Sequence, residues 1–144
     1  MATAYVYQCV ECEGYIEKRG SRSAPTSVTV TGTKKEGRAS LATATTSLVW
    51  DAAVSGEPIT DWDIFWIKSD QDLLVEFTGD ANGTYGTVLH AVKVLANEPK
   101  VVLRDDIIAN HTANFATGTV DVVDRIRVRN VSGSTALIDI LLLT

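Results

Sequence analysis

Residues 120–144 read Val-Asp-Val-Val-Asp-Arg-Ile-Arg-Val-Arg-Asn-Val-Ser-Gly-Ser-Thr-Ala-Leu-Ile-Asp-Ile-Leu-Leu-Leu-Thr. Residues 120–129 alternate between apolar and charged side chains, and residues 130–135 are turn formers. Residues 136–144 are almost entirely apolar, with Asp139 as the break. Alternation marks a half-buried strand, so the segment predicts a β-hairpin whose last strand is apolar on both faces.

A strand that is apolar on both faces belongs inside a packed sheet or beneath another subunit. One face of residues 136–143 carries three leucines and Asp139, and the opposite face carries Ala136, Ile138, Ile140 and Leu142. We expect the three leucines to form an oligomer interface, because a single sandwich needs only one apolar face of this strand. These candidate interface residues are Leu137, Leu141 and Leu143.

Short strand patterns continue back through the chain of 144 residues. Strands are predicted at residues 4–10, 26–31, 40–50, 61–68, 72–78, 87–95 and 100–103, in addition to the C-terminal pair. Residues 61–68 and 72–78 flank a tight turn and are predicted to form a second hairpin. Residues 34–37 read as a turn, and residues 105–118 as a connection with one helical turn at 106–109.

This spacing predicts an all-β fold, a single jelly-roll-like β-sandwich of about eight strands with an irregular N-terminal arm. Residues 1–40 are expected to hold an N-terminal strand and a basic arm or loop, and residues 41–144 the sandwich, within one domain overall. No apolar run is long enough for a transmembrane helix, and no secretory signal is evident, so we expect assembly in a cytosol.

Charge is unevenly distributed along a chain whose net charge is −5. Six basic side chains crowd into residues 17–38, where the only acidic ones are Glu17 and Glu36. Either this segment docks on an acidic surface, or it is a solvated loop of mixed charge. The candidate docking residues are Lys18, Arg19, Arg22, Lys34, Lys35 and Arg38. The acidic whole argues against general nucleic-acid binding.

Arg125, Arg127 and Arg129 share one face of a predicted strand, opposite Ile126 and Val128. A row of guanidinium groups needs water or carboxylates beside it. Pairing with acidic side chains on a neighbouring strand is the simpler explanation, and a contact with a partner protein is the alternative.

Candidates for chemistry are few. Cys9 and Cys12 have the spacing of one zinc knuckle, but no second pair of ligands completes a tetrahedral site. His90 stands between Val88 and Val92 and is expected to be a core or interface residue. His111 has no serine-nucleophile motif to accompany it. We therefore expect no enzyme, no metal and no other cofactor.

Aromatic side chains allow a different function, a carbohydrate-binding β-sandwich. Trp62 and Trp66 are predicted to share a strand face and could form a stacking platform, although Ile64 lies between them and favours a core.

Four segments resemble small jelly-roll decoration, or cement, proteins of tailed-bacteriophage capsids. They are Ser-Leu-Val-Trp at 47–50, Trp-Asp-Ile-Phe-Trp at 62–66, Leu-Leu-Val-Glu-Phe-Thr at 73–78, and Asp-Arg-Ile-Arg-Val-Arg-Asn-Val-Ser-Gly-Ser-Thr-Ala at 124–136. The resemblance implies a non-enzymatic homotrimer on the capsid exterior, with the major capsid protein as its partner. It implies no membrane, nucleic-acid or small-molecule partner, and assembly in the host cytoplasm.

Overall fold

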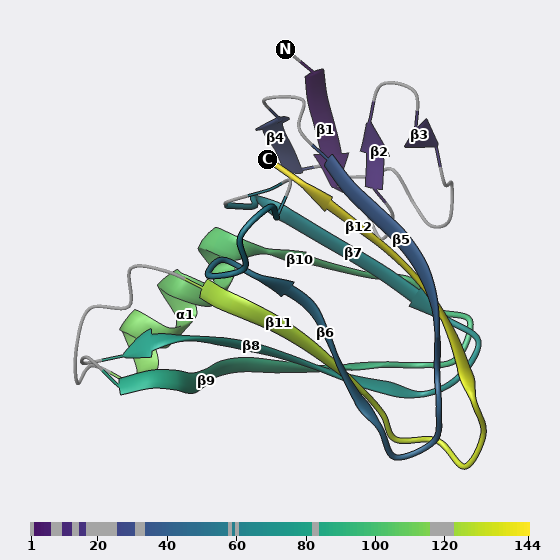
Figure 1. Cartoon of the computed structure of the whole chain (residues 1–144). Coiled ribbons are helices and arrows are strands. Elements are labelled where there is room, and N and C mark those ends of the chain that lie inside the picture. Colours follow the sequence, from purple (N-terminus) through teal and green to yellow (C-terminus); the bar gives the residue numbers. More distant parts are fainter. Residues whose placement is uncertain are drawn as a thin grey trace.

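A computed structural model describes the backbone of residues 2–6, 10–12, 15–16, 26–30, 34–57, 59, 61–81, 84–115 and 123–144 (Figure 1). Side chains are described for residues 34–57, 59, 61–79, 88–109 and 123–144. The body of the chain consists of two four-stranded antiparallel sheets and one helix, so the all-β sandwich prediction is confirmed.

Sheet I has the strand order β10-β7-β12-β5, and sheet II the order β6-β11-β8-β9. Sheet I consists of β5 (Lys34–Leu41), β7 (Ile64–Ser69), β10 (Lys100–Leu103) and β12 (Ala136–Leu143). Sheet II consists of β6 (Thr46–Asp51), β8 (Leu73–Ala81), β9 (Thr84–Val94) and β11 (Val123–Asn130).

The strand pairs are nested. β5 pairs with β12, β6 with β11, β7 with β10, and β8 with β9. A chain folded back on itself in this way and rolled into two sheets is a jelly roll. The two further pairs, β7 with β12 and β8 with β11, complete the sheets.

Both predicted hairpins are wrong, although their strands exist. β7 lies in sheet I and β8 in sheet II, so the turn at 70–72 carries the chain from one sheet to the other. The turn between β11 and β12 does the same. Alternation reveals a strand but not the strand with which it pairs. A short polar turn can connect two strands of different sheets as well as the two strands of a hairpin. Within sheets I and II, the paired strands that follow one another directly in sequence are β8 and β9.

Two other local predictions need correction. Lys34–Gly37 is not a turn, because β5 begins at Lys34 and pairs with β12 along its whole length. The predicted helical turn is part of a longer helix, α1 (Arg104–Phe115), which contacts β9 and β10. Asp105 and Asp106 occupy the first turn of α1, where their negative charges interact favourably with the positive end of the helix dipole and stabilise the helix. No helix in the described part of the chain is long and apolar enough to cross a membrane.

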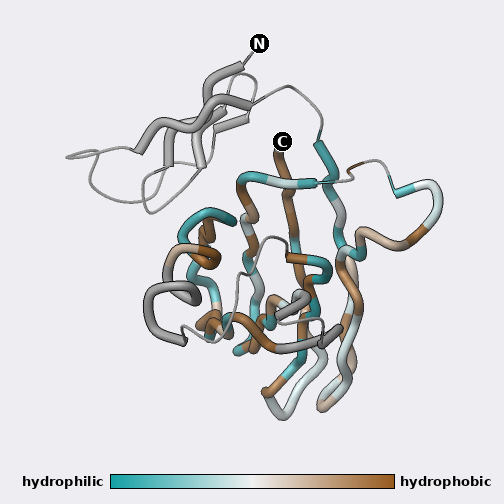
Figure 2. Tube along the Cα trace, turned by 90° about the vertical axis from the view of Figure 1, so that its left-hand side faces the viewer, coloured by the Kyte–Doolittle hydropathy of each residue, from teal (hydrophilic) through white to brown (hydrophobic). Residues whose placement is uncertain are grey.

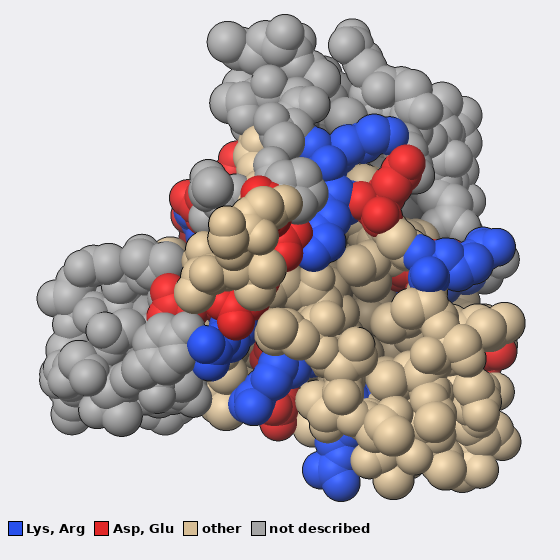
Figure 3. Space-filling model, in the orientation of Figure 1, with Lys and Arg blue, Asp and Glu red and all other residues tan. Residues whose placement is uncertain are grey.

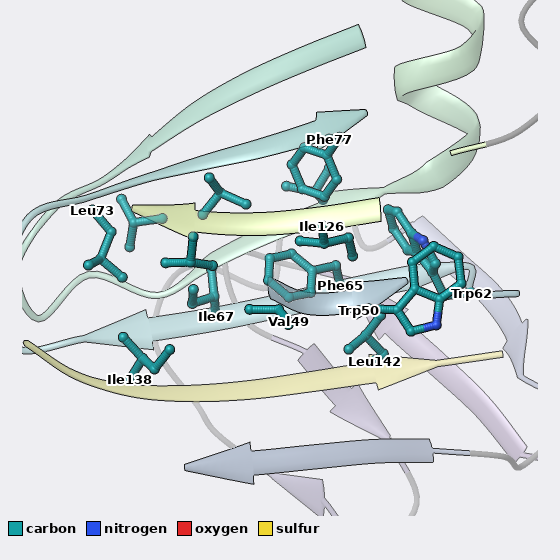
Figure 4. Packing of buried hydrophobic residues seen from close by; sticks show 14 of the residues in the cluster. Val49, Trp50, Trp62, Phe65, Ile67, Leu73, Phe77, Ile126, Ile138 and Leu142 are labelled. Atoms are coloured by element: carbon teal, nitrogen blue, oxygen red, sulfur yellow. The ribbon is translucent and has the colours of Figure 1, made fainter. Parts of the chain in front are cut away.

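The main core fills the space between the two sheets. Phe65 from β7 and Phe77 from β8 meet there edge to face, with ring centroids 5.7 Å apart (Figure 4). Trp62 packs against both rings and has no exposed surface. The indole nitrogen of Trp50 donates to the carbonyl of Ile59 at 2.8 Å, which anchors the loop before β7. Figure 2 shows the C-terminal strand β12 as a long hydrophobic stretch of the tube.

A separate four-stranded sheet precedes the sandwich in sequence, with the order β3-β2-β1-β4. Its strands are β1 (Ala2–Val6), β2 (Val10–Cys12), β3 (Tyr15–Ile16) and β4 (Thr26–Val30). Strands were predicted for β1 and β4, whereas β2 and β3 occupy a segment that was expected to be irregular. Lys18, Arg19, Arg22 and Cys9 lie outside the described residues, and the side chain of Cys12 is not among those described.

Candidate interaction surfaces

The outer face of sheet I, turned away from sheet II, holds a second apolar cluster. Cross-strand pairing places Leu141 beside Trp66, and Leu143 beside Ile64. Ile64, Leu141 and Leu143 are buried, with 0%, 3% and 5% of their surface exposed. The inward residues of β12, among them Ile138 and Leu142, belong to the main core. The prediction that β12 is apolar on both faces is therefore confirmed.

The three candidate interface leucines do not share one environment. Leu141 and Leu143 are buried within a single chain, whereas Leu137 is 55% exposed. Of the three, Leu137 alone is presented to solvent, so burial of Leu141 and Leu143 does not require a second subunit.

A shallow groove of about 360 Å³ crosses the outer face of sheet I, between β5, β12 and β7. Trp66 and Leu141 contribute to its lining, and so do Arg38 and Asp139. Arg38 donates to both oxygens of Asp139, with Nε–Oδ1 and Nη2–Oδ2 distances of 2.6 and 3.1 Å. The hydrogen bond to Asp139, together with its charge, raises the pKa of Arg38 above its usual value.

The prediction that Trp62 and Trp66 share a strand face is wrong, so the two rings do not form a stacking platform. Trp62 belongs to the main core, and Trp66 packs on the second cluster on the other side of sheet I. Strand β7 begins at Ile64, so the alternation that would place Trp62 and Trp66 on one face does not extend back to Trp62.

The three basic candidates on β5 all have acidic partners within the chain. Lys34 pairs with Glu36 at 3.3 Å, and Arg38 with Asp139. Lys35 is half-buried, pairs with Glu57 and donates to the carbonyl of Val49 at 2.9 Å. Lys35 therefore fastens β5 to β6 and to the loop after it. Replacing the three basic residues together would disturb the fold as well as any docking.

The arginine row on β11 pairs mainly within sheet II. Arg125 lies 2.6 Å from Asp51 on β6, and Arg127 lies 3.1 Å from Glu76 on β8. Arg129 is exposed. Ile126 and Val128, on the opposite face, have no exposed surface. Pairing with carboxylates on neighbouring strands, the simpler of the two explanations, is confirmed for Arg125 and Arg127.

The Asp51–Arg125 pair predicts a pH dependence of stability. Burial alone would raise the pKa of Asp51, but hydrogen bonds from Ala53 N–H and Arg125 outweigh it and leave this pKa below the ordinary 3.8. Because the lowered pKa favours the charged folded form, the contribution is full above pH 3.8 and disappears as pH falls through the folded pKa.

We expect the free energy of unfolding to fall as the pH drops below about 4, and to fall less in Asp51→Asn. Urea unfolding at a series of pH values measures this dependence. Glu98→Gln, at an exposed turn, is the matched control and should follow the wild-type curve. Identical slopes for Asp51→Asn and the wild type would refute the assignment.

Arg104 connects the loop before β7 to the start of α1. Its guanidinium pairs with Asp61 and lies 3.4 Å from Asp63, and its backbone N–H donates to the carbonyl of Asp63 at 3.1 Å. Burial raises the pKa of Asp63, and the charge of Arg104 opposes that rise. Among the described residues, no group of three His, Cys, Asp or Glu could hold a metal ion. His90 is half-buried, with its ring 6.1 Å from that of Phe77, as expected of a residue at the edge of the core.

The most distinctive surface is one end of the sandwich, which we call the neutral end. It consists of the β5–β6 loop (residues 42–45), the β11–β12 loop (residues 131–135) and Leu137. Residues 39–50 and 130–138 contain no charged side chain. Figure 3 shows a wide uncharged area low on the right, where Figure 1 draws these loops in the same orientation. Val131 is 47% exposed and Leu137 is 55% exposed.

Asn130 holds the neutral end in place from below, with no exposed surface of its own. Its amide nitrogen donates to the carbonyls of Leu41 and Ser134, at 2.9 and 2.7 Å. Its amide oxygen accepts from the backbone N–H and the hydroxyl of Ser132, at 2.9 and 2.7 Å. Both loops are thus tied to one buried side chain.

Backbone strain also marks this end. Ala44, in the β5–β6 loop, has a φ of 58°, a conformation that glycine adopts more readily than alanine. The hydroxyls of Thr43 and Thr45 donate to the carbonyls of Ser132 and Ala42 and hold the loop in this shape. Strained backbone of this kind is more frequent at functional positions than elsewhere. The signal available in the sequence was the charge-free run of residues 39–50.

Comparisons with known proteins identify no family. No family model matches the chain, and no curated protein matches it. One solved structure, reported under the description "Bacillus endospore appendages form a novel family of disulfide-linked pili", is 12% identical with a TM-score of 0.37. The match covers 77% of this chain and 86% of that one. A likeness at this level bears on neither the identity nor the function of the chain.

Proposed function

We propose that the chain is a non-enzymatic structural protein of a phage virion, a decoration protein that binds the outside of the capsid as a homotrimer. The observation that carries the proposal is the neutral end, whose own residues carry no charge and which exposes Val131 and Leu137, with Asp70 at its border. The partner is the major capsid protein, and the site of action is the virion exterior after assembly in the host cytoplasm.

Physical chemistry favours protein docking at this end. The centre of a protein–protein interface is poor in charged side chains, because each charge would have to lose its water. On a chain with a net charge of −5, the residues of the neutral end carry no charge of their own, and the exposed carboxylate of Asp70, which accepts from the N–H of Leu137 at 2.7 Å, borders them. Loops that are already fixed by Asn130 lose little conformational entropy on binding, which favours affinity.

The fold and the resemblance to decoration proteins support the same function. Jelly rolls occur in viral capsid domains, although also in lectins and cupins, so the fold alone does not decide. The last of the four resembling segments, residues 124–136, runs along β11 and into the neutral end. The carbohydrate-binding alternative depended on a platform of Trp62 and Trp66, and their positions on opposite faces of sheet I leave it without support.

The double variant Val131→Glu/Leu137→Glu tests the docking surface. We expect it to fold normally and to bind capsids at least about tenfold more weakly, because glutamates at an apolar contact must be desolvated. Leu48→Glu is the matched control, since Leu48 is 49% exposed on β6. Co-sedimentation with capsids that lack this protein, prepared from the phage whose genome encodes it, measures the binding.

Light scattering on the purified full-length chain tests the trimer separately. The expected mass is three times the chain mass of 15.5 kDa. A mass that is neither three chains nor a multiple of three, together with no binding to capsids, would overturn the proposed function. Equal capsid binding by the double variant and by wild type would instead reject only the neutral end as the docking surface.

A further inference from the structure

Strand β5 forms one edge of sheet I. It pairs with β12 over all eight of its residues, Lys34–Leu41, without a register shift. Among the described strands, none pairs with its other side. Natural edge strands are usually kept short, bulged, charged or interrupted by proline, because a long regular edge accepts another strand. The charges on β5 differ in sign, so a second copy in the right register can pair with them instead of being repelled. β5 contains neither a bulge nor a proline.

The residues of β5 select a particular partner strand. The outward face of β5 carries Lys34, Glu36 and Arg38 in alternating sign. When two copies of one strand pair antiparallel about a two-fold axis, the residue on the axis faces the same residue of the other copy. A residue a given number of positions before the axis in one copy faces the residue the same number of positions after it in the other copy. Each possible centre therefore defines one set of cross-strand neighbours.

Only one centre on this strand makes ion pairs without placing like charges together. An axis at Lys35, Glu36 or Arg38 puts that charge against its own copy. An axis at Gly37 places Glu36 of each copy against Arg38 of the other, which gives two opposite-charge pairs. It also brings the two copies together at a residue without a side chain, where backbones approach closely.

We propose that β5 is a self-pairing edge, at which a second copy of this chain adds its own β5 antiparallel, centred on Gly37, to make a continuous eight-stranded sheet. Glu36 and Arg38 set the register by pairing across the two copies. Arg38 is 77% exposed and Glu36 is 46% exposed, so both can reach across the edge. The contact is two-fold, so it joins two copies whether or not each also belongs to a trimer.

Disulfide trapping tests the register directly. In antiparallel pairs, facing Cα atoms lie about 4.5–5.5 Å apart, within the range of about 4.4–6.8 Å that a disulfide spans. A Cβ at Gly37 would meet only Ile140, at an ordinary contact distance of 3.6 Å, so Gly37→Cys is compatible with the fold. Cys9 and Cys12 are replaced by serine in all variants, to remove the native thiols.

Ser40→Cys is the matched control, because Ser40 lies on the same exposed strand. In the proposed register, Ser40 of one copy faces Lys34 of the other copy. The two Ser40 residues are therefore about 20 Å apart, at about 3.4 Å per residue. Under mild oxidation we expect Gly37→Cys to give at least about tenfold more linked dimer than Ser40→Cys on a non-reducing gel. Equal or absent linkage in the two variants would reject the proposal.

Charge reversal supplies a second test, with trapping by Gly37→Cys as the readout. All of these variants carry Asp139→Asn, because Arg38 also pairs with Asp139 within the chain. Glu36→Arg should lower the linked yield, since it puts arginines face to face, and Glu36→Arg/Arg38→Glu should restore it. A double variant that links no better than Glu36→Arg would overturn the Glu36–Arg38 register. Neither trapping test depends on a capsid, so failure of the proposed function would leave the edge contact standing.

Discussion

Leu141→Asp should unfold the sandwich even when no second copy is present. Leu141 is 3% exposed, and it packs with Ile64 and Leu143 on the outer face of sheet I. Aspartate there would be buried without a cation, or would have to expose the cluster to water. The expected loss in free energy of unfolding is on the order of 4 kcal/mol or more, which is a large share of the stability of a domain of this size.

Leu137→Asp is the control on the same face of the same strand. Leu137 is 55% exposed, so we expect its replacement to change the free energy of unfolding by less than about 0.5 kcal/mol. Chemical denaturation followed by tryptophan fluorescence measures both variants, at concentrations low enough to dissociate oligomers. A Leu141→Asp protein with wild-type stability as a monomer would show that this position is buried by another subunit and not by its own chain.

The strands were predictable from sequence because alternation depends on neighbouring residues alone. Leu73, Val75 and Phe77 face the core as expected, and so do Ile126 and Val128. Partner choice was not predictable, because it depends on contacts between distant residues. Nothing in the turn at 70–72 shows that β7 joins β12 and β10 while β8 joins β11 and β9.

The candidate surfaces were partly predictable for the same reason. The two-sided apolar character of β12 is local, so it was visible, but burial of Leu141 by β7 is a tertiary contact. Charged residues at 34–37 suggested a turn, although they form a strand whose partner lies about a hundred residues away along the chain. Trp62 was misplaced because it lies two residues before β7 begins at Ile64, where the alternation of the strand no longer applies.

Asn130 shows what pattern alone leaves hidden. In the sequence it is a polar turn residue, yet its amide is completely buried and makes four hydrogen bonds to Leu41, Ser132 and Ser134. Asn130→Ala would remove the amide donor from the buried carbonyl of Leu41 and the acceptor from Ser132, and we expect it to lower the free energy of unfolding by about 2–4 kcal/mol. Because both loops of the neutral end depend on it, capsid binding should weaken at temperatures where the variant is still folded.

Asn130→Asp separates the hydrogen bonds from the shape of the side chain. A carboxylate of the same size can still accept from Ser132, but it cannot donate to Leu41 or Ser134, and it buries a charge. We therefore expect at neutral pH a loss at least as large as that of Asn130→Ala. Protonation of the introduced carboxyl removes the charge and supplies one donor, so the deficit relative to wild type should shrink as pH falls from 7 to 4. Urea unfolding at both pH values measures it, and a deficit that is constant or grows at low pH would show that the donors of Asn130 do not hold the two loops.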